Sequence, residues 1–329
     1  MNYAETHSTD PYYNLAFEEY ILYHRRSEDW LLLWQNANTI VVGLNQNTAG
    51  EINASFVEEH GIRVVRRNTG GGAVYHDMGN LNYSFIMDAG DLGQLSMGRF
   101  TKSVCDALAE MGVEAEASGR NDITIQGKKV SGTAQRVHQG RILHHGTLLF
   151  QSDPQKIAGA LRVDPEKFVS KGTKSVQGRV GNIADFLPEK LSIDAFKANL
   201  RKALTADRFT PVRLATWELE EVKRIADTKY RTWAWNYGAS PPFRAVRKRA
   251  RFDGGSLEIW VEVQQGLIKS IRFLGDFMAR APLDTLEEAL VGCRFAQSEV
   301  STALAAFPLA DLFGGIQEGE ILDILFSEE

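Results

Sequence analysis

Apolar residues in the first part of the chain recur at spacings typical of both helices and strands. Asp10 followed by Pro11 is typical of a helix start, because an acidic cap precedes a proline at the first helical position. Behind it, five residues at helical spacing predict a face turned to the core: Tyr13, Phe17, Tyr20, Ile21 and His24. Further apolar runs predict strands at 30–34, 39–42, 62–65, 81–87, 123–125 and 142–150, and helices at 54–60 and 100–111. This mixture predicts the α+β class.

The pattern changes toward the carboxyl end. Helices are predicted at 193–204 and 217–226, and the segment 229–243, which ends in Gly, Ser and two prolines, is predicted to be a linker. Beyond it, two glycine turns separate three apolar runs and predict a three-stranded meander, followed by helices at 286–290 and 300–307. We therefore expect two domains, 1–242 and 243–329, of which the second is a small α+β domain.

Composition limits the classes of function. Of 329 residues, 43% are hydrophobic and 24% are charged, which is typical of a globular protein with room for two domains. The net charge of −5 argues against binding to nucleic acid or to a membrane surface, because such binding needs an excess of basic residues. No apolar run has transmembrane length, and the amino terminus lacks a signal-peptide pattern, so we expect a cytoplasmic protein and, by default, a monomer.

The two cysteines, Cys105 and Cys293, lie far apart in the chain. They lack the CxxC spacing of a zinc site and do not form a disulfide framework. Cys105 sits beside the apolar stripe of the predicted helix 100–111, so we expect it to pack rather than to act as a nucleophile.

The stretch from Arg66 to Asn82, RRNTGGGAVYHDMGNLN, combines two arginines with three consecutive glycines. Without Cβ atoms the glycine backbone can approach a ligand closely, and its N–H groups suit phosphate or carboxylate oxygens. Arg66 and Arg67 offer planar forks for the same oxygens. A glycine-rich hairpin with solvated arginines is the alternative. An apolar, strand-like run follows the glycines, so a helix dipole is not the expected anion-binding device.

A second stretch, GRNDITIQGKKVSGTAQR from Gly119 to Arg136, adds two neighbouring lysines after a tight turn at Gln126 and Gly127. Neighbours on a strand point to opposite faces, so one lysine is expected to face the interior. An interior lysine requires an anionic partner. Two solvated lysines on an edge strand are the alternative.

Histidines occur in pairs with other polar residues. His76 and Asp77 are adjacent on a predicted turn and are not expected to face each other as a catalytic pair. His144 and His145 diverge to opposite faces of a strand, so they cannot chelate one metal ion together. Of the two, His145 is placed near the anion pocket by its position.

Two further segments are rich in positive charge. Segment 171–182, KGTKSVQGRVGN, has the composition of a loop that orders over an anion, with an exposed flexible loop as the alternative. The predicted strand 244–251, RAVRKRAR, reads as a solvated basic face, with the acidic surface of a partner protein as its other possible contact.

The two stretches, together with HHGTLLF at 144–150, resemble lipoate-protein ligases, specifically the bacterial type with a carboxy-terminal accessory domain. The three blocks occur in the order and spacing of that family, and the likeness covers nearly the whole chain. The resemblance implies a mixed β-sheet core with flanking helices, as in biotin and lipoate ligases. It also implies a two-step reaction in which lipoate is activated by ATP as lipoyl-AMP and then transferred to a lysine of an acceptor domain.

The resemblance also implies roles for individual residues. Lys129, matched through KVSG, is implied to contact the lipoyl carbonyl and the phosphate, and Arg67 to hold the adenylate phosphate. The backbone cradle and wall are implied to comprise Gly71, Gly72, Ala73, Val74 and Tyr75. Asn121 and Asp122 are implied to orient Mg²⁺ or the incoming amine, with Asp122 as the metal ligand, and Arg179 to lie in a nucleotide-covering loop. The acyl tail is expected near Val64, Val74 and Tyr75.

The implied cofactors are ATP and Mg²⁺, with lipoate as the substrate. The implied partners are lipoyl-acceptor domains, either E2 subunits of 2-oxoacid dehydrogenases or the glycine cleavage H protein. An octanoyl or lipoyl transferase is disfavoured, because no cysteine lies between Cys105 and Cys293 to form its thioester. A biotin ligase is disfavoured by the absence of a GRGRxG arrangement. A non-catalytic lipoate- or nucleotide-binding protein remains an alternative from another class.

Overall fold

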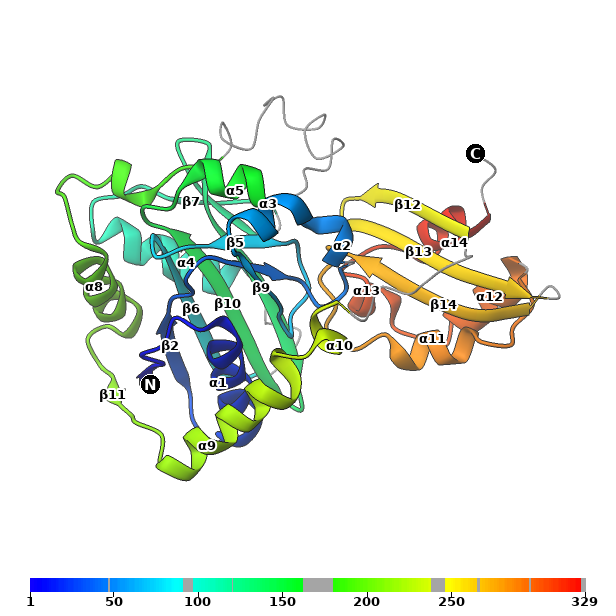
Figure 1. The fold of residues 1–329 in the computed structure, drawn as a ribbon, viewed down its shortest axis with the longest axis horizontal. Helices are drawn as coiled ribbons and strands as arrows, with labels where there is room; N and C mark the ends of the chain where they lie inside the picture. Colours follow the sequence, from blue (N-terminus) through cyan, green and yellow to red (C-terminus); the bar gives the residue numbers. More distant parts are fainter. Residues whose placement is uncertain are drawn as a thin grey trace.

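The computed structural model describes residues 1–46, 48–90, 97–119, 121–161, 180–237, 246–264, 267–295 and 297–326. A large body built on an eight-stranded sheet carries a smaller body with a three-stranded sheet at one end (Figure 1). Both bodies mix helices and strands, which confirms the α+β prediction. Within the described ranges, no helix combines the length and the hydrophobicity that a bilayer crossing requires.

The large sheet is mixed. In spatial order its strands are β11 (Thr210–Pro211), β1 (Asn2–Glu5), β2 (Trp30–Trp34), β6 (Asn80–Asp88), β10 (Arg141–Leu149), β9 (Lys128–His138), β8 (Asp122–Ile125) and β7 (Glu116–Ser118). The first three run parallel to one another, and every later pairing is antiparallel. The predicted strands at 30–34, 81–87, 123–125 and 142–150 all lie in this sheet.

The central strands are buried on both faces, which explains their continuous apolar runs. Side chains of β2 alternate: Trp30, Leu32 and Trp34 pack against α1 (Pro11–His24) and α9 (Thr216–Ile225). The intervening Leu31 and Leu33 pack against the opposite layer, formed by α4 (Met97–Ala109) and α8 (Ile193–Thr205). Two helical layers therefore enclose the sheet.

Helix α1 differs from its prediction in what it buries. It begins where expected, since the Asp10 side chain accepts a hydrogen bond from the Tyr12 amide at 3.2 Å. The helix is then buried on almost every side, including Glu18 and Glu19, whereas His24 at its end is exposed. A single apolar stripe was therefore the wrong expectation, because the helix is inserted among the sheet, β4 and α9.

A second, three-stranded sheet carries the glycine stretch. Its order is β4 (Arg63–Arg66), β3 (Thr39–Val42) and β5 (Val74–His76), with β3 in the centre. The glycines connect β4 to β5, so a strand follows them, as predicted. Val64 and Tyr75 belong to a separate apolar cluster beside α3 (Ala54–Glu59) and α5 (Pro154–Ala160).

The remaining elements of the large body are short. They are α2 (Thr48–Glu51), the 3₁₀ turn η2 (Ile183–Asp185), the π-helical turn η3 (Ala226–Tyr230) and α10 (Trp233–Asn236). The last two correct the predicted linker, because residues 229–237 are folded onto β4 rather than joining two domains. The predicted boundary at 242 and 243 lies outside the described residues.

The small body contains the predicted meander, β12 (Val246–Phe252), β13 (Gly255–Gln264) and β14 (Leu267–Gly275). The helices that cover it are α11 (Asp284–Leu290), α12 (Gln297–Leu304), α13 (Leu309–Leu312) and α14 (Glu318–Phe326), of which the last two were not predicted. In the predicted basic strand the side chains of 244–249 lie outside the described residues, and Arg251 is exposed.

The small body touches the glycine stretch directly. The Gly275 amide donates to the Asn45 carbonyl at 2.5 Å, and the Gly71 amide donates to the Phe277 carbonyl at 3.4 Å. A Cβ atom at Gly70 would lie 2.5 Å from the same Phe277 oxygen. The end of the meander therefore packs against the backbone of the glycines.

Arg66 holds the loop after β3, which the small body contacts through Asn45. Its side chain is 2% exposed and bonds both the loop after β3 and the α10 segment. The acceptors are Gly43 O (2.9 Å), Leu44 O (3.0 Å), Gln46 O (2.7 Å), Thr48 Oγ1 (2.7 Å), Trp235 O (3.0 Å) and Asn236 O (3.3 Å). Arg66 thus joins segments that are far apart in sequence.

We expect Arg66→Met to lower the free energy of unfolding by about 3–5 kcal/mol, because the bonded oxygens stay buried and lose their donor. Urea unfolding at neutral pH measures this loss. Lys102→Met is the matched control, since the exposed Lys102–Asp106 pair of α4, 2.6 Å long, contributes about 0.5 kcal/mol or less. Equal losses in the two variants would contradict the role of Arg66.

Candidate functional site

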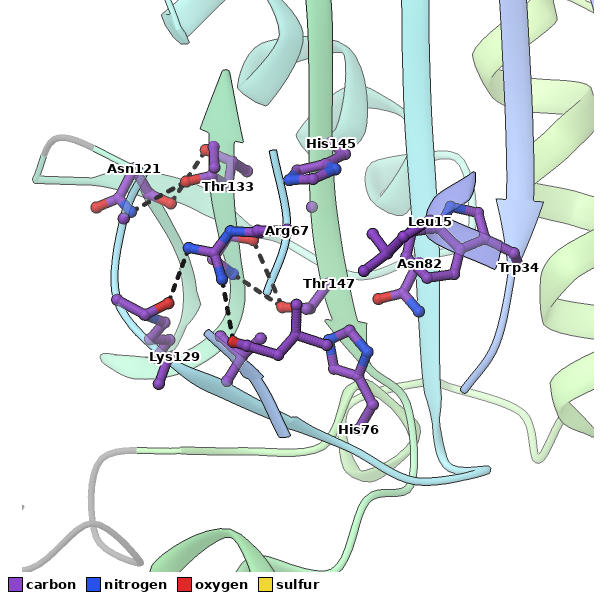
Figure 2. Close-up of a pocket in the computed structure, with 18 residues that line it drawn as sticks. Leu15, Trp34, Arg67, His76, Asn82, Asn121, Lys129, Thr133, His145 and Thr147 are labelled. Atoms are coloured by element: carbon purple, nitrogen blue, oxygen red, sulfur yellow. Dashed lines mark hydrogen bonds between the residues drawn. The ribbon is translucent and has the colours of Figure 1, made fainter. Parts of the chain in front are cut away.

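A cavity lies between the large sheet, α1 and the glycine stretch (Figure 2). It is lined by Leu15, Trp34, Val41, Arg67, Gly71, Gly72, Ala73, Val74, His76, Asn82, Asn121, Lys129, Gly132, Thr133, Ala134, His145, Gly146 and Thr147. Both stretches singled out in the sequence contribute to this one wall. The structure therefore brings together residues separated by more than fifty positions.

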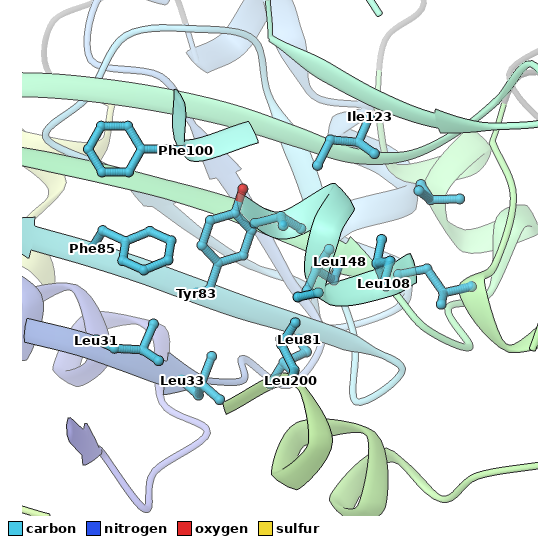
Figure 3. Close-up of a cluster of buried hydrophobic side chains, with 14 of the residues drawn as sticks. Leu31, Leu33, Leu81, Tyr83, Phe85, Phe100, Leu108, Ile123, Leu148 and Leu200 are labelled. Atoms are coloured by element: carbon cyan, nitrogen blue, oxygen red, sulfur yellow. The ribbon is translucent and has the colours of Figure 1, made fainter. Parts of the chain in front are cut away.

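Strand alternation decides which side chains reach the cavity. His145 and Thr147 of β10 line the cavity. Asn82 of β6 also lines it and lies in register with Thr147. His144 points the other way and stacks on Phe100 at 4.6 Å between ring centroids. That opposite face holds the apolar cluster of Figure 3, where Phe100 lies beside Phe85 and Tyr83. The predicted divergence of the two histidines and the position of His145 are both confirmed.

Arg67 lies behind the glycines with its donors turned toward their carbonyl groups. It is 6% exposed, and burial lowers the pKa of its guanidinium to about 10, so it remains protonated at neutral pH. Its acceptors are Val41 O (3.1 Å), Thr69 Oγ1 (3.0 Å), Gly70 O (2.7 Å) and Gly72 O (2.9 Å). Arg67 therefore holds the shape of the glycine segment.

This arrangement orients the amides of the glycine segment. In a planar trans peptide unit the carbonyl and the N–H point in opposite directions. Because Arg67 binds the carbonyls of Gly70 and Gly72, the N–H groups of Gly71 and Ala73 point away from the guanidinium. Gly71 has φ +90°, and a Cβ there would lie 3.0 Å from Arg67 Nη2, so only glycine fits. The Gly71 N–H is used by the Phe277 carbonyl of the small body at 3.4 Å, which leaves the Ala73 N–H as the outward donor above a buried cation.

Lys129 supplies the second cation of the cavity. It lies on β9 with its Nζ 2.7 Å from Oδ1 of Asp122 on β8, and the two side chains are 34% and 16% exposed. Lys128 is exposed on the other side of the strand, as the alternation predicts. The predicted inward lysine with an anionic partner is therefore confirmed.

The neighbours of Lys129 give it a defined space. A Cβ at Gly132 would lie 3.2 Å from the Lys129 Nζ, so the lysine folds over a residue without a side chain. Asn121 is fixed beside it, because Asn121 Nδ2 donates to Thr133 O at 3.1 Å and Asn121 O accepts from Thr133 N at 2.8 Å. An oxyanion in the cavity would meet the Lys129 ammonium and the glycine segment.

Known families account for both bodies of the chain. The family model of the lipoyl protein ligase A/B catalytic domain matches residues 10–205, and that of the bacterial lipoate protein ligase C-terminus matches residues 240–325. The chain belongs to the lipoate-protein ligase family. Lipoate-protein ligase LplJ of Bacillus subtilis is 42% identical over 323 residues, covering 96% of this chain and 97% of its own. Lipoate–protein ligase 1 of Staphylococcus aureus is 40% identical over 319 residues, with coverages of 96% and 97%.

Solved structures agree with this membership. LipL1 of P. falciparum, in complex with lipoate, superposes with a TM-score of 0.81 over 98% of this chain and 97% of its own; at 24% identity it shows the fold alone. A lipoate-protein ligase A bound with ATP superposes with a TM-score of 0.63 at 25% identity, over 72% of this chain and 98% of its own. The predicted ligase-like fold is thus confirmed, and the ligase interpretation is supported over a transferase or a non-catalytic binding protein.

The implied site residues of the ligase fall into three groups. Most line the cavity: Arg67, Gly71, Gly72, Ala73, Val74, Asn121 and Lys129. Asp122 pairs with Lys129, whereas the Tyr75 side chain lies in the separate cluster and donates to Asn38 Oδ1 at 2.9 Å. Arg179 lies outside the described residues, as does most of the predicted loop 171–182. Which of these residues contact substrate stays a prediction.

The apolar lining of the ligase cavity corrects the expected acyl tunnel. Val74 is part of it, but Val64 and Tyr75 pack on the far side of the small sheet. Their place is taken by Leu15, Trp34, Val41 and Ala134. The sequence predicts only that Leu15 lies in a helix and Trp34 in a strand, because neither position alone indicates a pocket.

A buried polar chain connects the glycine segment to the sheet of the ligase. Thr69 Oγ1, which accepts from Arg67, lies 2.7 Å from His145 Nε2, and His145 Nδ1 lies 2.9 Å from Oε1 of Glu18. Ser84 Oγ donates to the same carboxylate at 2.6 Å, and Trp34 Nε1 donates to Ser84 at 2.9 Å. Each partner presents one donor to one acceptor, so the chain fixes the orientation of every member.

The neighbouring Asn68 joins a different network. Its Oδ1 accepts from Lys229 Nζ at 2.9 Å, and its Nδ2 donates to Tyr230 Oη at 2.7 Å. Both partners also bond Glu19 Oε2, at 2.7 Å from Lys229 and 2.6 Å from Tyr230. The sequence analysis missed Glu18 and Glu19. Two adjacent acids inside the otherwise apolar LAFEEYI segment were the available sign that charges are buried there.

A Mg²⁺ site built from protein groups alone is not formed by the residues that the structure describes. Among them, no three His, Cys, Asp or Glu side chains come together to bind an ion. Asp122 offers one carboxylate, already paired with Lys129. Mg²⁺ characteristically takes one or two carboxylates and completes its shell with phosphate oxygens and water. The donor set therefore fits an ion that arrives with a nucleotide.

We expect Thr69→Val to lower the free energy of unfolding by about 1–3 kcal/mol, because Arg67 Nε and His145 Nε2 each lose a buried partner. Thr101→Val is the matched control. Its hydroxyl is also buried but donates only to the Met97 carbonyl of its own helix, at 3.0 Å, so its loss is about 1 kcal/mol or less. Chemical unfolding measures the free energy of unfolding of both variants. A smaller loss for Thr69→Val than for Thr101→Val would refute the proposed chain of hydrogen bonds.

Proposed function

We propose that this chain activates lipoate with ATP and transfers the lipoyl group to a lysine of an acceptor lipoyl domain. One observation carries the proposal: Lys129 and the glycine segment, which Arg67 holds from behind, line one cavity. An acyl adenylate needs cationic and N–H donors where its phosphate and carbonyl charge develop. The relatives named lipoate-protein ligase and the ATP-bound ligase support the same pair of substrates.

In the first step a carboxylate oxygen of lipoate attacks the α-phosphorus of ATP. The new O–P bond forms as the bond to the β-phosphate oxygen breaks, which gives lipoyl-AMP and pyrophosphate. Negative charge gathers on the α-phosphate oxygens during this exchange. Lys129 and the N–H group of Ala73 would meet that charge, with Arg67 adding positive potential from behind the glycines. In this role Arg67 acts chiefly through the segment that it holds.

In the second step the amine of the acceptor lysine attacks the acyl carbonyl. The C–N bond forms, the bond between the carbonyl carbon and the phosphate oxygen breaks, AMP leaves, and the neutral amine nitrogen gives up one proton. Asp122 is the carboxylate beside Lys129 and would take up a proton, while Asn121 orients the amine. Lys129 stays positioned for the oxyanion of the tetrahedral intermediate and for the phosphate that departs.

Mg²⁺ would enter the cavity on the triphosphate and neutralise part of its charge. Asp122 is the proposed protein ligand, which requires its carboxylate to leave the ion pair with Lys129. That exchange frees the ammonium for the α-phosphate. The covering role of Arg179, the monomeric state and the cytoplasmic location remain predictions from the sequence.

The acceptor class follows from the relatives. A bi-partite ligase from Thermoplasma acidophilum, described together with its E2 lipoyl domain, superposes on this chain at 29% identity with a TM-score of 0.65, over 74% of this chain and 98% of its own. We propose E2 lipoyl domains and the glycine cleavage H protein as acceptors.

A purified E2 lipoyl domain tests the proposed function. Incubated with this chain, Mg-ATP and lipoate, it is expected to gain the mass of one lipoyl group. Intact-mass spectrometry measures the gain, with reactions lacking ATP or carrying a lysine-to-arginine acceptor as controls. Acylation without ATP would instead identify a transferase, and lipoate binding with no acylation of E2 or H-protein acceptors would identify a binding protein.

Lys129→Ala tests the proposed role of the inward lysine. We expect pyrophosphate release to fall by at least about 100-fold, because the charge that forms on the phosphate loses its ammonium. Lys128→Ala is the matched control, since it removes the same group from the solvent face of the same strand. Thermal unfolding of both variants monitors the fold. If folded Lys129→Ala released pyrophosphate at a near-normal rate, the proposed role of Lys129 would be refuted.

A further inference from the structure

Two polar side chains in the cavity wall have hydrogen-bond donors that no described residue uses. These are Nε2 of His76 and Nδ2 of Asn82, whose side chains are 3% and 2% exposed. A buried donor without a partner carries the full cost of its desolvation. Such groups are explained when a ligand supplies the acceptor.

Neighbouring side chains determine which atom of His76 carries the proton. Asn14 Nδ2 donates to Asn36 Oδ1 at 2.9 Å, so the other end of the Asn36 amide must be its NH₂ group. That NH₂ group lies 3.1 Å from Nδ1 of His76, which therefore accepts. The ring proton is then on Nε2. Burial, reinforced by the charge of Arg67, lowers the pKa of His76 to about 3, so the imidazole is neutral at physiological pH.

Asn82 is bonded at one end of its amide. Its Oδ1 accepts from Asn80 Nδ2 at 3.0 Å, and its NH₂ group has no partner among the described residues. On the sheet it lies between Trp34 of β2 and Thr147 of β10. Both groups are uncharged donors, so they can bind a neutral acceptor without a counter-charge.

Their position relative to Lys129 identifies the part of the ligand that they meet. Figure 2 shows Asn82 beside Leu15 and Trp34, across the cavity from Lys129 and Asn121. In the proposed function, Lys129 contacts the carboxyl end of the acid. The far end of the acyl chain would then reach the apolar wall of Leu15 and Trp34. The two free donors thus lie where a hydrocarbon tail would offer no acceptor.

We propose that His76 and Asn82 recognise the sulfur-bearing end of lipoate and so favour it over an unbranched fatty acid of the same length. The sulfur atoms of the dithiolane ring are weak acceptors, which suits neutral donors in an apolar wall. Octanoate fills similar space but leaves both donors unpaired, and a site built around hydrogen bonds disfavours a ligand that lacks the partner. This inference rests on the proposed function, because it requires the acyl chain to lie in this cavity.

The test compares lipoate with octanoate in wild-type enzyme and in Asn82→Leu and His76→Phe, which keep the approximate size of each side chain. For each acid, kcat/KM comes from pyrophosphate release and Kd from calorimetry. Each variant is expected to lower the lipoate-to-octanoate ratio by about 3- to 10-fold, as expected for one lost hydrogen bond. The octanoate constants should hold steady or improve. His24→Phe, at an exposed histidine on α1, is the matched control and should leave the ratio unchanged.

A measurement on the unmodified protein needs no variant to fold. With ¹⁵N-labelled histidine, the Nε2–H resonance of His76 is expected to shift when lipoate binds and to shift less with octanoate. Equal shifts for the two acids, or equal losses for both acids in the folded variants, would overturn the inference. Failure of the proposed function is seen separately, because wild-type enzyme would then release no pyrophosphate with either acid although calorimetry still compares their binding.

Discussion

The site depends on two buried guanidinium groups whose bonded partners are carbonyl and hydroxyl oxygens. Moving a cation out of water costs several kcal/mol, and that cost is offset only when enough oriented dipoles surround it. Arg66 and Arg67 obtain those dipoles from the segments that form the cavity. Once the glycine carbonyls turn toward Arg67, the N–H groups of the same peptide units must face the opposite way. The direction of the Ala73 amide, which would meet an anion in the proposed reaction, thus follows from the burial of a cation behind it.

Four consecutive residues share this task and bond mainly to different parts of the structure, while Arg67 also donates to Thr69 Oγ1. Arg66 holds the loop after β3 and the α10 segment, Arg67 the glycines, Asn68 the Glu19 network, and Thr69 the chain to Glu18. Each network is buried and each uses a different part of the sequence. Any displacement of the glycine segment therefore breaks bonds in several directions at once, which is how a loop of three glycines keeps a defined shape.

Local patterns were sufficient to predict most strands, the opposite faces of Lys128 and Lys129, and the meander. Such features depend on spacing within a few residues. The burial of Glu18 cannot be predicted from such spacing, because its partner His145 is 127 positions away. The predicted linker 229–243 is wrong over 229–237 for the same reason: the contacts of this part with Glu19 and Arg66 span 211 and 169 positions. A charged or aromatic residue is classed as exposed by local pattern until a distant partner is known.

The two cations that line the cavity differ in how firmly they are held, and this difference suits a reaction in two steps. Arg67 is 6% exposed and bonded to backbone oxygens that cannot leave, so its position stays constant. Lys129 is 34% exposed and held by one carboxylate, which can be exchanged for another anion at modest cost because water screens the pair. In the proposed reaction the α-phosphate and then the carbonyl oxyanion appear in turn. A fixed charge can shape the glycine segment for both, but only an exchangeable one can follow the charge from one atom to the next.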